Sequence, residues 1–253
     1  MSAKEKERPV AALILAAGKG TRMGAERAKV LHRLHGITML QMVLDTARAV
    51  GTDPTVVVVG FDKDSVIRAL PGDVAWVHQK EQLGTGHAAL QAENVFNGYT
   101  GDVLVLYGDV PLVRTTTLKK LVEEHRRQSA DTTLVTAVVE GESTYGRVMR
   151  TDTGTFARIV EWKDASEEIR KVQEINTGLY CFKAELLFTA LKEVRNENEQ
   201  HEYYLTDVFE IIKKRGGKVG VFTIADATEA MGVDTLKALE DAEKVLAERD
   251  KKA

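Results

Sequence analysis

The chain has 253 residues, 43% of them hydrophobic, and its 35 basic and 38 acidic residues give a formal net charge of −3. A chain of this length buries roughly 70–75% of its extended surface, so it needs no disulfide or metal to fold. The near balance of charge gives no reason to expect nucleic acid or an anionic membrane as a partner. Any phosphate binding must therefore come from cations that are placed locally.

The N-terminal residues and the single cysteine indicate the compartment. Residues 1–9 are charged and lack the apolar stretch of a signal peptide, and no run of about 18 apolar residues exists to span a bilayer. Cys181 lies in an apolar stretch with no acid–base partner nearby in sequence, which predicts a packed core thiol. We therefore expect a cytoplasmic chain with a flexible tail over residues 1–9.

Short apolar runs alternate with longer amphipathic segments, which is typical of a mainly parallel sheet covered by helices. Strands are predicted over residues 10–15, 55–59, 74–78, 102–106, 132–139, 147–150 and 176–182. Helices are predicted over residues 39–50, from about residue 86, over 116–128 and over 235–247. The apolar faces of the first and last helices are formed by Leu40, Val43, Leu44 and Ala47, and by Leu236, Leu239, Ala242 and Leu246. No linker or internal repeat divides the chain, so we expect a single domain over residues 10–250.

The first predicted strand leads directly into a basic, glycine-rich loop. Residues 13–24 read LILAAGKGTRMG. The P-loop pattern fails because Gly20 follows Lys19 where serine or threonine is required, and the dinucleotide pattern fails because Met23 replaces the third glycine. Small residues with the cations Lys19 and Arg22 suit a triphosphate, because backbone N–H groups approach phosphate oxygens where side chains are absent. For the GKG sequence alone, an ordinary tight turn with solvated cations is the simpler interpretation.

Further motifs follow this loop. They are AKVLH (28–32), HQKEQLGTGHA (78–88), VLYGDVPL (105–112), YGRVMR (145–150), IVEWKDA (159–165), QEINTG (173–178) and EYYLTD (202–207). In order and approximate spacing, the set resembles the bacterial N-acetylglucosamine-1-phosphate uridyltransferase domain, the N-terminal half of the bifunctional GlmU enzymes. The resemblance covers roughly residues 10–240. The loop motif alone would indicate only the broad superfamily of sugar-1-phosphate nucleotidyltransferases.

The resemblance implies a fold and a reaction. The fold is α/β and Rossmann-like, a mainly parallel mixed sheet flanked by helices with a smaller sugar-binding lobe, called the nucleotide-diphospho-sugar transferase fold. Residues of about 10–139 would form the nucleotide-binding core, about 140–225 the sugar-binding lobe, and about 226–250 a metal-ligand turn and final helix. The reaction joins UTP and N-acetylglucosamine 1-phosphate, with Mg²⁺ as cofactor, to give pyrophosphate and UDP-N-acetylglucosamine, a cell-envelope precursor. Such phosphoryl transfer requires mainly positioning and charge neutralisation.

Two carboxylates match the Mg²⁺ position of this family. Asp109 follows a predicted central strand, at the edge where parallel sheets bind ligands, and carboxylate oxygens suit a hard ion. A simple turn is the structural alternative for Asp109. Asp234, in MGVDTLKAL, stands where the family commonly has asparagine and is also an oxygen donor. Its alternative role is to cap the last helix by accepting from the backbone N–H of Leu236 or Lys237.

The resemblance also assigns the nucleotide side. Arg22 matches the residue that neutralises the triphosphate and the leaving pyrophosphate, and Lys29 the residue that binds phosphate near the α position. Ala28 stands where the signature usually has proline, so a fixed φ angle is lost beside Lys29. The other positions offer backbone contacts or amide groups that suit the edge of uracil. They are Leu15, Ala16, Ala17, Gly18, Gln79, Gln82, Gly84, Thr85, Tyr107 and Gly108.

The positions that match the sugar side are Gly146, Glu161, Asn176 and Thr177. A carboxylate accepts hydrogen bonds from sugar hydroxyls, and an amide side chain can bond the acetamido group or the phosphate. These residues would therefore set a preference for the amino sugar. For Glu161 the alternative is an exposed acid at the end of a strand, paired with Lys163.

Alternative functions make different predictions. A different sugar phosphate, such as glucose 1-phosphate with UTP or dTTP, is the nearest alternative, because one hydroxyl changes selectivity by only ~1–3 kcal/mol where hydrophobic contacts decide. A catalytically silent relative predicts the loss of Arg22, Lys29, Asp109 or the C-terminal metal position, and none of these is lost. A nicotinamide-dependent oxidoreductase fails on the missing third glycine. The chain ends without the hexapeptide repeats of the acetyltransferase half, so we expect no acetyltransferase step and a monomer or weak homo-oligomer.

Overall fold

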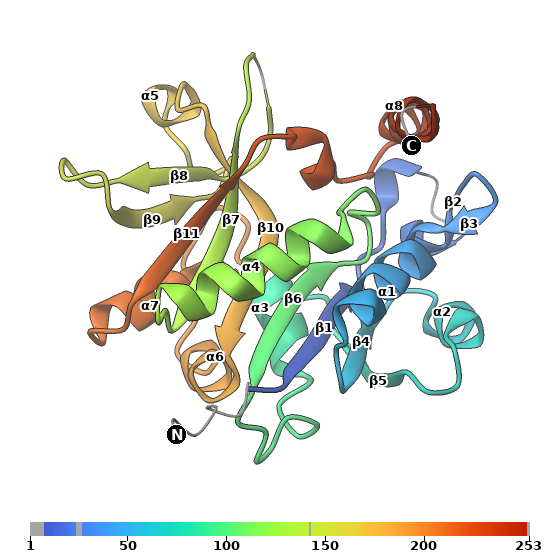
Figure 1. The fold of residues 1–253 in the computed structure, drawn as a ribbon, viewed down its shortest axis with the longest axis horizontal. Coiled ribbons are helices and arrows are strands. Elements are labelled where there is room, and N and C mark those ends of the chain that lie inside the picture. The colour runs from blue at the N-terminus through green and yellow to red at the C-terminus, as the bar shows by residue number, and fades with distance from the viewer. Residues whose placement is uncertain (1–7, 24–26, 142, 252–253) are drawn as a thin grey trace, which may run out of the picture.

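The computed structural model describes residues 8–23, 27–141 and 143–251. Its main feature is a nine-stranded mixed sheet with helices on both faces, accompanied by a small two-stranded sheet of β2 (Arg33–Leu34) and β3 (Ile37–Thr38) (Figure 1). The main strand order is β11-β7-β10-β6-β1-β4-β5. These strands are β1 (Val10–Ala16), β4 (Thr55–Val59), β5 (Ala75–His78), β6 (Asp102–Tyr107), β7 (Thr132–Val138), β10 (Glu174–Lys183) and β11 (Val219–Ile224).

Along this seven-strand order, four of the six neighbouring pairs are parallel. β1 pairs in parallel with β4 and β6, β4 with β5, and β7 with β11. β10 runs antiparallel to both β6 and β7, which makes the sheet mixed. The hairpin of β8 (Arg147–Arg150) and β9 (Phe156–Val160) pairs with β10 and, with α5 (Glu167–Arg170), forms a lobe at one side of the sheet (Figure 1). The predicted fold class, a mainly parallel mixed α/β sheet with a smaller lobe, is confirmed.

Helices enclose two cores, one on each face of the sheet. The first face is covered by α1 (Met39–Val50), α2 (Lys63–Ala69) and α4 (Thr115–Arg127), and the second by α3 (Thr85–Leu90), α6 (Ala184–Leu191) and α7 (Asp207–Lys214). β1 supplies Ala12 and Ile14 to the first core and Leu13 and Leu15 to the second. Because β1 is buried on both faces, its sequence is a continuous apolar run rather than an alternating one.

The helix α1 has its predicted bounds because the sequence marks both of its ends. The Thr38 hydroxyl accepts a hydrogen bond from the N–H of Gln41 at 3.2 Å, which caps the N-terminus. Gly51 follows the last turn at φ 89°, in the left-handed region that favours glycine. The residues predicted for the apolar face are all buried. The strands predicted over residues 55–59 and 147–150 also match β4 and β8.

The last helix, α8 (Leu236–Asp250), differs from its prediction at its start. Thr235 is the N-cap, because its hydroxyl accepts from the N–H of Ala238 at 3.0 Å. The capping role considered for Asp234 is therefore wrong. Leu236 is 57% exposed, so it does not belong to the apolar face. The helix packs through its later turns, where Ala242 is fully buried in a small third cluster.

Several elements have no counterpart among the predicted ones: α2, α5, α6, α7, β2, β3, β9 and β11. The strands β9 and β11 are mostly half-exposed, so their sequences lack a long apolar run. Cys181 has no exposed surface, and burial raises the pKa of its thiol well above the usual value, so the predicted core thiol is confirmed. In the described part of the chain, no helix has the length and hydropathy needed to cross a membrane.

Candidate active site

The carboxyl ends of β1 and β6 carry the centre of the candidate site. The two strands are parallel neighbours, and Gly108 donates its N–H to the carbonyl oxygen of Leu15 at 2.9 Å. A side chain at Gly108 would place its Cβ 3.2 Å from Val30, so glycine permits the close approach of the two segments. This packing brings Asp109 next to Lys29, with which it forms an ion pair.

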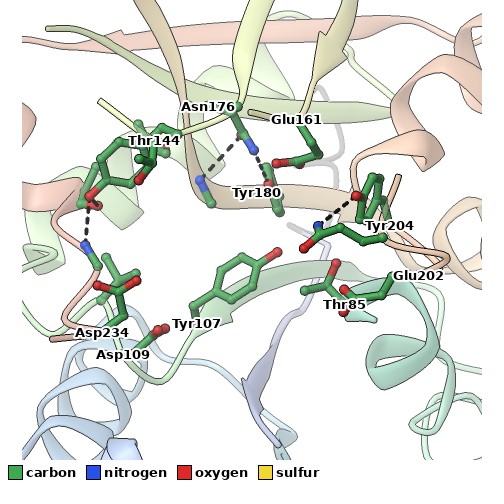
Figure 2. Close-up of a pocket in the computed structure, with 18 of the residues that line it drawn as sticks. Thr85, Tyr107, Asp109, Thr144, Glu161, Asn176, Tyr180, Glu202, Tyr204 and Asp234 are labelled. Carbon is green, nitrogen blue, oxygen red and sulfur yellow. Dashed lines mark hydrogen bonds between the residues drawn. The ribbon is translucent and has the colours of Figure 1, made fainter. Parts of the chain in front are cut away.

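Two adjoining pockets open at this edge of the sheet. We call them the loop-side pocket, with a volume of about 540 Å³, and the lobe-side pocket, with a volume of about 370 Å³. Both are lined by Thr85, Tyr107, Asp109 and Glu202, so they meet at the end of β6. Figure 2 shows the lobe-side pocket, with Tyr107 between the carboxylates of Asp109 and Asp234 on one side and Thr85 on the other.

The predicted site residues divide between these pockets. The loop-side pocket is lined by Leu15, Ala16, Ala17, Gly18, Lys29, Gln79, Gln82, Gly84, Thr85, Tyr107 and Asp109. The lobe-side pocket is lined by Arg22, Thr85, Tyr107, Asp109, Gly146, Glu161, Asn176, Thr177 and Asp234. Gly108 is buried where the ends of β1 and β6 meet. The structure therefore brings together residues that lie up to 219 positions apart, from Leu15 to Asp234.

The loop before α3 is held against the chain that precedes α7. Gly84 has φ 112°, and a Cβ there would lie 2.6 Å from the carbonyl oxygen of Tyr203, so both conformation and space require glycine. Gln79 is 3% exposed, and its amide nitrogen donates to the carbonyl oxygen of Gly84 at 3.1 Å. Gln82 donates in turn to the carbonyl oxygen of Gln79 at 3.2 Å. The two glutamines thus line the pocket and also hold the shape of its loop.

Two ion pairs lie side by side at the meeting point of the pockets. Lys29 pairs with Asp109, and Nη2 of Arg22 lies 2.6 Å from Oδ2 of Asp234. The turn before α8 reaches β6 directly, because Val233 donates its N–H to the carbonyl oxygen of Asp109 at 2.8 Å. Figure 2 shows both carboxylates at the same end of the lobe-side pocket. Two carboxylates from distant parts of the chain are therefore neighbours.

This donor set fits Mg²⁺. Carboxylate oxygens are hard ligands, and Mg²⁺ typically takes only one or two of them while keeping water and phosphate oxygens. Among the described residues there is no group of three or more histidine, cysteine and acidic side chains that could hold a metal ion, so a zinc-type set is absent from that part of the chain. Two carboxylates, Asp109 and Asp234, are therefore a donor number that this ion accepts.

The lobe-side pocket has a polar wall built on β9 and β10. Glu161 accepts from the hydroxyl of Thr206 at 2.8 Å, and burial raises the pKa of the Glu161 carboxyl above its usual value. A Cβ at Gly146 would lie 3.2 Å from Oε2 of Glu161, so glycine leaves room for this carboxylate. Asn176 is 7% exposed and donates its amide N–H to the hydroxyl of Tyr180 at 2.8 Å. These groups present fixed acceptors and donors to the cavity.

Two side chains of this wall have partners that the sequence did not indicate. Lys163 donates to Oε1 of Gln200, so the alternative in which Glu161 is an exposed acid paired with Lys163 is wrong. Thr177 is 2% exposed, and its hydroxyl donates to the carbonyl oxygen of Val135 at 2.7 Å. Its side chain therefore bonds within the sheet, while the residue still forms part of the pocket lining.

Further lining residues are not among the predicted site residues. They include Tyr145, Gln200, Glu202 and Tyr204. Tyr204 accepts from the amide of Gln200 at 2.7 Å, and Figure 2 shows this bond beside Glu202. Three of these residues lie within the motifs YGRVMR and EYYLTD, so attention to the neighbours of the matched positions would have found them.

Comparison with known proteins gives the family. The family model described as "MobA-like NTP transferase domain" matches residues 12–202 of this chain. The bifunctional protein GlmU of Halalkalibacterium halodurans is 45% identical over 94% of this chain, and that of Acetivibrio thermocellus is 41% identical over the same share. The chain spans about half the length of these relatives, 52% in both cases.

A solved structure shows the same fold. The crystal structure of UDP-glucose pyrophosphorylase complexed with UDP-glucose matches with a TM-score of 0.76 at 17% identity, covering 96% of this chain and 99% of that one. At this identity the likeness concerns the fold alone. Because the family match covers residues 12–202, most of the chain and both walls of the loop-side pocket, the chain belongs to the MobA-like NTP transferase domains.

Proposed function

We propose that the chain is a UDP-N-acetylglucosamine diphosphorylase, which transfers UMP from UTP to N-acetylglucosamine 1-phosphate and releases pyrophosphate. The observation that carries this proposal is the meeting of two pockets at Asp109: Lys29 lines the loop-side pocket, and Arg22 and a polar wall line the lobe-side pocket. A transferase needs two substrates whose reacting atoms meet at one point. The similarity to GlmU proteins at 41–45% identity supports the choice of substrates.

In this proposal the loop-side pocket holds the nucleotide. Gln79 and Gln82, which line this pocket, would bind the base, and the glycine-rich loop with Lys29 would bind the phosphates. An oxygen of the sugar phosphate attacks the α-phosphorus of UTP, a new P–O bond forms, and the bond to the β-phosphate oxygen breaks as pyrophosphate leaves. The attacking oxygen is already anionic, so no general base is required. Catalysis then depends on positioning and on neutralising phosphate charge, which Arg22 and Lys29 are placed to do.

Asp109 and Asp234 would hold Mg²⁺ in this proposal. The ion would supply positive charge to the phosphate oxygens. Residues of about 226–250 then contribute one metal-holding turn, and residues of about 10–139 contribute the other together with the nucleotide pocket. The lobe of about 140–225 contributes the sugar wall.

The polar wall of the lobe-side pocket, formed by Gly146, Glu161 and Asn176, is consistent with an amino sugar as substrate. Glu161 is held by Thr206 at 2.8 Å, so its carboxylate presents a fixed acceptor for sugar hydroxyls. Asn176 carries both an acceptor and donors near the same cavity. A site built to bond polar groups of a substrate discriminates against analogues that lack them, because its own buried groups are then left unpaired.

The test is pyrophosphate release with Mg²⁺, measured for UTP, dTTP, CTP and ATP against the 1-phosphates of N-acetylglucosamine, glucosamine and glucose. The highest kcat/KM is expected for UTP with N-acetylglucosamine 1-phosphate, and Asp109→Ala should abolish release. A higher value for another pair would overturn the substrate assignment and retain the reaction. Absence of release with every pair would favour a catalytically silent relative.

A further inference from the structure

Tyr145 joins the lobe to the turn that carries Asp234. Its hydroxyl accepts from the N–H of Gly232 at 3.0 Å and donates to the carbonyl oxygen of Ala230 at 3.2 Å. These bonds span 87 and 85 positions of sequence. One phenol oxygen therefore ties the segment between β11 and α8 to the start of β8.

The tied turn also contacts the end of β6. Val233, next to Gly232, donates its N–H to the carbonyl oxygen of Asp109 at 2.8 Å. Asp234 follows immediately and lines the lobe-side pocket together with Asp109. Because residues 232 and 233 are held by different partners, the position of Asp234 relative to Asp109 depends on both hydrogen bonds.

Tyr145 is itself held firmly from the lobe. Arg147 is 2% exposed and donates to the backbone carbonyl oxygens of Tyr145 and Ser143, the latter at 2.8 Å. Its guanidinium lies 4.8 Å from the centre of the Trp162 ring, a cation–π contact. A buried guanidinium bonded to backbone carbonyls fixes the loop before β8, so the tyrosine reaches the turn from a rigid support.

Burial, helped by two nearby carboxylates, keeps the hydroxyl of Tyr145 protonated. Burial raises the pKa of Tyr145, the N–H of Gly232 lowers it, and the carboxylates of Asp234 and Asp109 raise it again. The net direction is upward from an ordinary value near ~10. The phenol therefore keeps its proton for the bond to Ala230 throughout the neutral pH range.

We propose that Tyr145 is a positioning residue that sets Asp234 against Asp109 for the binding of a divalent cation. It acts through the backbone of residues 230–232 and lies outside the metal-ligand set itself. The inference rests on the proposed function for the identity of the reaction, whereas the cation binding that it predicts is measured without any substrate. The lobe would then have two roles: Gly146 belongs to the wall proposed for the sugar, and Tyr145, in the same loop, positions the cation site.

The test variant is Tyr145→Phe, which removes the hydroxyl and keeps the ring. Binding of Mn²⁺ to the free protein, measured by the loss of the EPR signal of the free ion, is expected to weaken about tenfold, as for other outer partners of metal ligands. Amide hydrogen exchange at Gly232 and Val233 is expected to become faster. Wild-type Mn²⁺ affinity in the variant would overturn the proposal, and so would a wild-type chain that binds no Mn²⁺.

The matched control is Tyr99→Phe. The hydroxyl of Tyr99 is buried, finds no hydrogen-bond partner in the described part of the chain, and lies before β6, at the opposite end of that strand from Asp109. Its removal is expected to leave Mn²⁺ binding and amide exchange at the turn unchanged. Thermal unfolding of both variants separates a local effect from loss of the fold.

The reaction gives a third readout for Tyr145→Phe. The Mg²⁺ concentration for half-maximal pyrophosphate release is expected to rise about tenfold, with kcat restored at saturating Mg²⁺. A structural defect would instead lower kcat at every Mg²⁺ concentration, which would contradict a positioning role. If the wild-type chain released no pyrophosphate with any substrate pair, the proposed function would fail, while the Mn²⁺ comparison would still decide the role of Tyr145.

Discussion

Arg22 and Asp234 form an ion pair, with Nη2 of the arginine 2.6 Å from Oδ2 of the aspartate. The pair of Lys29 and Asp109 lies beside it. Each carboxylate proposed for the cation is therefore paired with a basic group proposed for the phosphates. In the proposed function, phosphates would replace the carboxylates as partners of the basic groups, and Mg²⁺ would be held by the carboxylates. Each charged group of the site would then keep a partner of opposite charge.

Substitution of Asp234 tests its role as an oxygen ligand. Asp234→Asn is expected to retain substantial activity, because the amide keeps an oxygen donor, whereas Asp234→Ala is expected to lose most of the activity. The measurement is kcat for pyrophosphate release across a series of Mg²⁺ concentrations. Near-full activity of Asp234→Ala would show that Asp234 is not a ligand of the cation.

The neighbouring residue provides the control for that experiment. Thr235 caps α8 through its hydroxyl, so Thr235→Ala is expected to cost about 1 kcal/mol of stability and to leave the Mg²⁺ dependence unchanged. Chemical denaturation of Thr235→Ala and Asp234→Ala separates the two effects. A shifted Mg²⁺ dependence in the threonine variant would mean that the helix start, rather than the carboxylate, controls the site.

Substitution of the two site cations is predicted to slow the chemical step. Arg22→Ala and Lys29→Ala each remove positive charge from the meeting point of the pockets, where phosphate charge develops. A fall of roughly 10²–10³ in kcat is expected, with a smaller change in KM for UTP. The control of equal charge change is Lys214→Ala, at the exposed end of α7, where the lysine pairs with Glu210 on the same helix. An unchanged kcat with a raised KM would instead assign these residues to ground-state binding.

Much of the site was predictable because its residues lie at the ends of buried strands. The apolar run of β1 and the sequence that follows β6 are both local signals, and parallel strands bring their carboxyl ends to one edge. The ends of α1 are likewise set by adjacent residues, Thr38 at its start and Gly51 at its end. For these features, a short stretch of sequence contains the physical cause of the structure.

Other features depend on contacts that no local pattern contains. The bond from Thr206 to Glu161 joins residues 45 positions apart, whereas the alternative partner considered from the sequence was the near neighbour Lys163. The start of α8 depended on which of two adjacent residues, Asp234 or Thr235, turned its oxygen toward the helix. Both are acceptable N-caps, and Asp234 instead pairs with Arg22, which lies far away in sequence.

A methyl group at Gly146 is predicted to damage sugar binding selectively. A Cβ there would lie 3.2 Å from Oε2 of Glu161 and 3.3 Å from Ile159, so the carboxylate must move by a few tenths of an ångström. The KM for the sugar 1-phosphate in Gly146→Ala is expected to rise roughly tenfold, with the KM for UTP little changed. Gly72→Ala is the control, because a Cβ at Gly72 meets nothing within 4 Å. Equal changes in both KM values would contradict a role for this wall in sugar binding.

The pH dependence of stability is predicted from Asp207, at the start of α7. Burial, and then the charges of Glu161 and Glu210, raise the pKa of Asp207 to about 6. The folded chain therefore holds this proton more tightly than the unfolded chain, whose aspartate titrates near ~3.9, so the free energy of unfolding falls as pH rises from about 4 to about 6. Asparagine carries no charge at any of these pH values, so Asp207→Asn should not show this fall in the free energy of unfolding. The variant is expected to be about 1–2 kcal/mol more stable than wild type at pH 7.5, after allowance for solvent screening. Urea denaturation at pH 7.5 and pH 4 should show that the advantage disappears at the lower pH, whereas exposed Asp64→Asn should show no such difference. An advantage that persists at pH 4 would arise from a cause other than the buried charge.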